Sequence, residues 1–106
     1  MTTKYHNRKT EHQGIRFDSQ KKANRYRDLL LLERAGEIEN LELQPRYDLV
    51  VNGHKIGFYR ADFRYEVVTT STMMVEDVKS PATKTAVYRL KKKLVKALYG
   101  VEIIEV

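Results

Sequence analysis

Hydrophobic positions recur with two different periods along the chain, and these periods predict where helices and strands form. A first helical pattern begins at Ser19 or Asp18, either of which can cap a helix, and it ends before Gly36. A second helical pattern begins near Thr83 and ends before Gly100. The apolar residues on one side of the first helix are Ala23, Tyr26, Leu29 and Leu30. Those of the second, a stripe typical of an amphipathic helix, are Val87, Leu90, Leu94, Ala97 and Leu98.

Alternation of apolar and polar residues predicts strands between the helices and at the end of the chain. Residues 47–51, followed by an Asn-Gly pair, are typical of a strand and a hairpin turn. One continuous strand is expected over residues 55–68, another over 73–79 and a short one over 101–106. The order of helix, three or four strands, helix and strand predicts an α/β sandwich around a mixed sheet. The last strand should lie parallel to its neighbour, because a helix precedes it.

The chain has 106 residues, enough for one domain, and we expect that domain to cover residues 17–106. Residues 1–16 are polar and basic without periodicity, which predicts a flexible arm. There are no cysteines, so disulfides and zinc–thiolate sites are excluded, and no apolar run is long enough to cross a membrane. Both observations fit a cytoplasmic protein.

Charge is distributed unevenly along the chain, whose formal net charge is +6. Residues 1–27 carry a net charge of +6, residues 28–78 carry −5, and residues 79–106 carry +5. Basic ends around an acidic middle suggest a protein that binds a polyanion and keeps carboxylates for another purpose. The alternative is a solvated surface whose charge is merely uneven.

Asp77, Val78 and Lys79 form the clearest local signal for chemistry. Residues two apart on a strand point the same way, so Asp77 and Lys79 should project side by side. Asp62, on the preceding strand, can join them, and two aspartates with the Val78 carbonyl make a partial cage for Mg²⁺. Lys79 could orient the attacking water or stabilise charge in the transition state. The alternative is an ordinary cross-strand ion pair between an aspartate and an arginine.

Two further residues are accessory candidates. Glu76 should face the opposite side of the strand from Asp77, although a bulge could exchange the two. Gln44, before Pro45, stands at the start of a strand, where its amide could touch a substrate.

Basic residues cover the second helix around its apolar stripe, a pattern that favours contact with phosphates. A solvated amphipathic helix would show the same pattern. The candidate residues for binding nucleic acid, with two from the first helix, are Lys84, Arg89, Lys91, Lys92, Lys93, Lys96, Lys22 and Arg25.

Taken together, these segments resemble the PD-(D/E)XK nuclease superfamily, and within it a group of small phage and prophage proteins. The resemblance covers nearly the whole chain. It is carried by Phe17-Asp18-Ser19, Arg25-Tyr26, residues 32–38, Leu43-Gln44-Pro45, residues 61–65, residues 75–80 and the basic helix around residues 90–94.

The resemblance implies a restriction-endonuclease-like αβββαβ core, with a mixed central sheet flanked by two helices. It implies phosphodiester hydrolysis with Mg²⁺ or Mn²⁺ as the cofactor, with Asp62, Asp77 and Lys79 as the catalytic residues. It also implies DNA as the substrate, including branched DNA, a homodimeric state, and a phage or prophage protein acting in the bacterial cytoplasm.

One departure from the group concerns the first helix, where its members commonly carry a glutamate as an extra metal ligand. Here Lys22 stands in that region, and the neighbouring residues offer no carboxylate. Because the other segments resemble the group, the leading hypothesis is a metal-dependent DNA endonuclease. The alternative is a nucleic-acid-binding protein that keeps the fold and has lost the chemistry.

Overall fold

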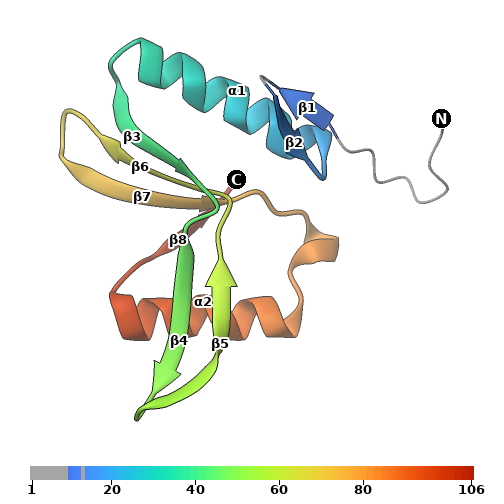
Figure 1. Cartoon of the computed structure of the whole chain (residues 1–106), viewed down its shortest axis with the longest axis vertical. Helices are drawn as coiled ribbons and strands as arrows, with labels where there is room; N and C mark the ends of the chain where they lie inside the picture. Colours follow the sequence, from blue (N-terminus) through green and yellow to red (C-terminus); the bar gives the residue numbers. More distant parts are fainter. Residues whose placement is uncertain (1–9, 13) are drawn as a thin grey trace, which may run out of the picture.

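A mixed sheet of four strands forms the centre of the computed structural model, which describes residues 10–12 and 14–106 (Figure 1). The first three strands across the sheet are antiparallel, and the fourth runs parallel to the third. In their order across the sheet they are β3 (Ile38–Leu43), β6 (Phe63–Val67), β7 (Thr72–Asp77) and β8 (Ile103–Glu105).

Two helices begin at residues whose hydroxyl groups cap them. The Ser19 hydroxyl accepts a hydrogen bond from a backbone N–H at the start of α1 (Gln20–Arg34). The Thr85 hydroxyl does the same for α2 (Ala86–Tyr99), which follows the short 3-10 helix η1 (Pro81–Thr83). Gly100 ends α2 with a φ of +68°, a conformation that favours glycine. Neither helix is long and apolar enough to cross a membrane.

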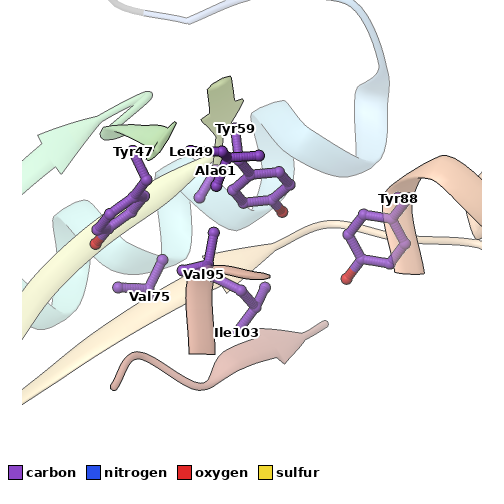
Figure 2. Packing of buried hydrophobic residues seen from close by; sticks show 8 residues of the cluster. All are labelled: Tyr47, Leu49, Tyr59, Ala61, Val75, Tyr88, Val95 and Ile103. Carbon is purple, nitrogen blue, oxygen red and sulfur yellow. The ribbon is translucent and has the colours of Figure 1, made fainter. Parts of the chain in front are cut away.

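The helices cover opposite faces of the sheet. Tyr26 and Leu29 of α1 pack against Phe63, Tyr65 and Val78 in one hydrophobic cluster. The other cluster joins residues of α2, β7 and β8 to a separate hairpin, formed by β4 (Arg46–Val51) and β5 (His54–Arg60) (Figure 2). Its buried residues are Tyr47, Leu49, Tyr59, Ala61, Val75, Tyr88, Val95 and Ile103. The predicted mixed α/β class and the parallel last strand are both confirmed.

The strand expected over residues 55–68 is two strands. β5 pairs with β4, whereas β6 pairs with β3 and β7, and the chain bends between them at Ala61 and Asp62. A matching break lies between β3 and β4, at Gln44 and Pro45. Pro45 has no backbone N–H to donate to a neighbouring strand. Alternation continues through the bend, so the pattern alone did not reveal it.

Three further strands differ from the expectations drawn from the sequence. β3 was not predicted, because its polar residues Glu39 and Asn40 interrupt the apolar alternation. β1 (Thr10–His12) and β2 (Ile15–Phe17) form a hairpin against α1, so the end of the expected arm is regular structure. Residues 1–9, the rest of that arm, lie outside the described residues.

The predicted apolar stripe of α2 is mostly exposed rather than buried. Val87 and Leu90 are 62% and 59% exposed, while Tyr88 and Val95 are buried against the sheet. Successive helical residues are about 100° apart, so the contacting side is rotated by about one residue from the stripe. Tyr88 is therefore a core residue, and α2 presents apolar side chains to solvent.

This rotation predicts different costs for two truncations on α2. Val95→Ala removes buried atoms and should lower the free energy of unfolding by about 1.5–3 kcal/mol. Leu90→Ala, the matched control, should change it by less than about 0.5 kcal/mol. Urea denaturation of both variants checks this, and equal losses would contradict the helix orientation.

Candidate functional site

The bend between β5 and β6 fixes the position of Asp62. Its backbone N–H donates to the Glu76 carbonyl at 3.1 Å, and its carbonyl accepts from the Gln44 N–H at 3.0 Å. Gln44, which makes this bond, has a φ of +50°, a value uncommon for a residue with a side chain. Asp62 thus sits where the central sheet and the β4–β5 hairpin diverge.

Asp62 and Asp77 are brought together by the backbone between them. The Val78 N–H donates to Asp62 Oδ2 at 2.8 Å, so the Asp62 carboxylate lies against the Asp77–Val78 peptide. Asp77 is the last residue of β7, and the Val78 side chain is buried among residues of the α1 cluster. The structure therefore places Asp62, Asp77 and Val78 together, as the sequence analysis expected.

The Asp77 carboxylate is buried without full compensation. The residue is 3% exposed, and its Oδ2 atom has no hydrogen-bond partner. Lys79 Nζ lies 3.9 Å from that oxygen, close enough for attraction but too far for a hydrogen bond. Burial raises the pKa of Asp77 to about 6, against the opposing effect of Lys79 and Lys22.

Lys79 is held beside Asp77 by an aromatic ring. Its Nζ lies 4.2 Å from the centre of the Tyr88 ring, and its carbonyl accepts from Lys21 Nζ at 2.7 Å. A cation over a ring face is attracted to it, so Tyr88 limits where the ammonium can point.

Glu105 adjoins the site, and the sequence analysis missed it. It pairs with Asp77 in the parallel register of β7 and β8, and its charge adds to the rise in the Asp77 pKa. Tyr88 donates to Glu105 Oε2 at 2.8 Å, and this bond, with Lys84 and Lys92, lowers the pKa of Glu105 to about 2. The signal available in the sequence was the parallel last strand, but only the register identifies which residue meets Asp77.

Lys22 reaches into the site from α1. Its Nζ lies 3.2 Å from Asp62 Oδ1 and 3.2 Å from Asp18 Oδ1. Burial lowers the pKa of Lys22, but the two carboxylates more than offset this and raise it. Lys22 therefore stays charged and neutralises Asp62.

Glu76 faces the other side of β7, as expected from the alternation of a strand. It is 1% exposed and receives two hydrogen bonds from Arg25, at 2.7 and 2.6 Å, and one from Tyr65. The hydrogen bonds with Glu76 raise the pKa of Arg25. Burial and its own hydrogen bond to Glu76 raise the pKa of Tyr65 to about 12. Glu76 thus anchors α1 to the sheet, and two nitrogens of Arg25 are already used.

The oxygen ligands at this site suit a hard cation. Among the described residues, no group of three or more His, Asp or Glu side chains is arranged to hold a metal ion. Mg²⁺, however, keeps several waters and needs few protein ligands. Asp77 Oδ2, which is buried and has no hydrogen-bond partner, would supply one ligand. Asp62 and the Val78 carbonyl complete a set that fits, provided that Lys22 yields Asp62 Oδ1.

Several of the basic residues proposed to bind nucleic acid have carboxylate partners. Lys84 and Lys92 lie 3.0 and 3.2 Å from Glu105, and Lys96 lies 3.0 Å from Glu102. Within the described part of the chain, Arg89, Lys91 and Lys93 form no ion pair.

A cavity of about 350 Å³ opens beside Asp62 and Lys22. Gln44 lines it, with Arg16 and Phe17 of β2 on another side. The proposed accessory residue Gln44 therefore shares this cavity with Asp62.

A model of one protein family matches residues 2–103 of the chain, nearly its full length. The chain belongs to the DUF1064 family. The description of this family is "Protein of unknown function". No curated protein and no solved structure matches the chain.

The raised pKa of Asp77 predicts a pH-dependent gain from Asp77→Asn. Between about pH 4 and 6 the folded protein holds a proton that the unfolded chain has released, so wild-type stability falls as the pH rises. The variant lacks this dependence. Its free energy of unfolding should exceed that of the wild type by about 1–3 kcal/mol at pH 7 and by little below pH 4.

Urea denaturation from pH 4 to 7 in EDTA measures this difference. A gap that does not change with pH would show that the Asp77 carboxylate is not held in an unfavourable charged state.

Proposed function

We propose that this member of the DUF1064 family is a metal-dependent DNA endonuclease. The observation that carries the proposal is the Asp77 carboxylate, which is buried with one unpartnered oxygen beside a second aspartate and a lysine. A buried charge without full compensation is costly, and such groups gather at functional sites. A divalent cation would compensate it.

Asp77 and Asp62, with the Val78 carbonyl, would hold Mg²⁺ or Mn²⁺. The bound ion supplies a more acidic water and neutralises charge on the phosphate under attack. The hydrogen bond from Val78 N–H orients the Asp62 carboxylate, so one ligand is positioned before the cation arrives.

Lys79 acts on the reacting phosphate through its ammonium group. Tyr88 and Asp77 position that group at one edge of the site, where it can stabilise negative charge as the phosphodiester is cleaved.

The arrangement of elements agrees with the resemblance to the PD-(D/E)XK superfamily. The central sheet and its helices follow the order α1, β3, β6, β7, α2, β8, with the β4–β5 hairpin inserted after β3. That order corresponds to αβββαβ. DNA as the substrate is supported by the net charge of +6 and by the basic residues without acidic partners. A preference for branched DNA and a homodimeric state rest on the resemblance alone.

A second candidate is a nucleic-acid-binding protein without catalysis, and Lys22 favours it. The Lys22 ammonium occupies Asp62 Oδ1 at 3.2 Å, so it competes with a cation for that oxygen. In a binding protein of this kind, Lys22 would neutralise Asp62 in place of a metal ion, and the bound nucleic acid would not be cleaved.

Cleavage of linear duplex, single-stranded, flap and four-way-junction DNA with Mg²⁺ or Mn²⁺ tests the leading candidate. Asp77→Asn should abolish cleavage. Lys79→Ala should slow it about a hundredfold or more while leaving DNA affinity nearly unchanged, because the ammonium acts mainly on the transition state. Equal loss of binding and cleavage in Lys79→Ala would contradict this role, and no cleavage by the wild type would favour the second candidate.

Lys22 variants test the second candidate. Lys22→Glu adds a carboxylate and removes the competing ammonium, so Mg²⁺ affinity measured by calorimetry should rise about tenfold or more. Lys22→Gln removes only the charge and should give a smaller gain. Unchanged affinity in both variants would show that Lys22 does not compete for the cation site.

A further inference from the structure

The β4–β5 hairpin has one face that neither helix covers. Tyr47, Leu49 and Tyr59 point into the core, so the alternate residues of both strands face outward. Among these, Phe58 is 40% exposed and Ile56 is 61% exposed. Large apolar side chains are therefore exposed on the outer face of this hairpin, whose strands β4 and β5 are labelled in Figure 1.

Three cations surround the Phe58 ring. The Arg46 guanidinium lies 4.0 Å from the ring centre, that of Arg60 lies 5.7 Å away, and Lys91 Nζ of α2 lies 5.6 Å away. Among the residues that the structure describes, Asp48 is the one acidic partner of these cations, 3.1 Å from Arg46. We call Phe58, Arg46, Arg60 and Lys91 the Phe58 platform.

Folding alone gives little reason for this arrangement. Arg46 and Arg60 are direct cross-strand partners, and like charges in such positions repel. Cation–π contacts at exposed sites are weak and do not require three cations around one ring. An anionic ligand with flat aromatic groups would satisfy both the charges and the ring.

We propose that the Phe58 platform stacks an unpaired base of DNA, while its arginines and lysine contact the adjoining phosphates. Stacking on an aromatic side chain needs an exposed base face, which paired bases inside a duplex do not offer. The platform therefore selects single-stranded segments or the unpaired bases of branched DNA. The inference rests on the proposed function in taking DNA as the ligand.

The platform is close enough to the aspartates to position a substrate. Phe58 and Asp62 are four residues apart, so their Cα atoms are at most about 14 Å from each other. Arg60 lies between them in sequence. A strand stacked on Phe58 would thus have its next few phosphates near Asp62 and Asp77.

The test is fluorescence anisotropy with labelled oligothymidine and with a duplex of equal length, in EDTA so that cleavage plays no part. Phe58→Ala should weaken oligothymidine binding about fivefold or more and duplex binding much less. Phe58→Trp should keep the affinity. Ile56→Ala, on the same strand and more exposed, is the matched control and should change affinity less than about twofold. Arg60→Gln should lower the slope of log affinity against log salt by about 0.7.

Equal effects of Phe58→Ala on single strand and duplex, or equal effects of Phe58→Ala and Ile56→Ala, would overturn the proposal. So would a wild-type dimer in sedimentation that Phe58→Ala dissociates, because the face would then join two copies of the chain. Absence of any oligothymidine binding at low salt would also overturn it. The two proposals can fail separately. Binding that depends on Phe58 but is not followed by cleavage would contradict the endonuclease and support the platform. Cleavage that Phe58→Ala does not alter would contradict the platform and leave the endonuclease supported.

Discussion

Two adjacent carboxylates of β7, Glu76 and Asp77, are buried on opposite faces of one sheet, and they differ in how fully hydrogen bonds compensate their charge. Glu76 receives three hydrogen bonds, from Arg25 and Tyr65, so its charge is matched by donors from α1 and β6. Asp77 has a lysine at 3.9 Å and an oxygen with no hydrogen bond. Loss of Arg25 would leave the buried Glu76 carboxylate with Tyr65 as its remaining hydrogen-bond donor among the described residues, so the Arg25–Glu76 contact holds α1 to the sheet. The same strand can therefore carry an uncompensated charge on its other face.

Lys22 connects these two faces, because it belongs to the helix that Arg25 anchors and reaches the aspartate that adjoins Asp77. The contact between Arg25 and Glu76, one turn farther along, fixes α1 on the sheet. The Lys22 ammonium therefore lies beside Asp62. Any cation that binds Asp62 Oδ1 must displace it, and Asp18 is already in place to receive it at 3.2 Å. Displacement of Lys22 from Asp62 distinguishes the two candidate functions, because the buried Asp77 carboxylate is common to both.

The sequence predicted the helices, the parallel last strand and the meeting of Asp62 with Asp77, because each follows from local periodicity or from spacing along a strand. It did not predict the bend at Gln44 and Ala61, since alternation continues through it. Nor did it predict which side of α2 is buried. That orientation depends on the β4–β5 hairpin, which supplies Tyr47, Leu49 and Tyr59 to the cluster in which α2 buries its side chains. Glu105 was missed for a similar reason, because strand register is a tertiary property.

The rotation of α2 also affects which of its cations have acidic partners. Lys92 and Lys96 of α2, and Lys84 before the helix, form ion pairs with Glu105 or Glu102, so these charges are largely neutralised within the protein. Lys91, which the sequence placed among the basic residues around the apolar stripe, instead lies 5.6 Å from the centre of the Phe58 ring. Lys91 thus joins Arg46 and Arg60 in a small basic group beside the Phe58 ring. Such a group fits a ligand recognised by stacking as well as by charge.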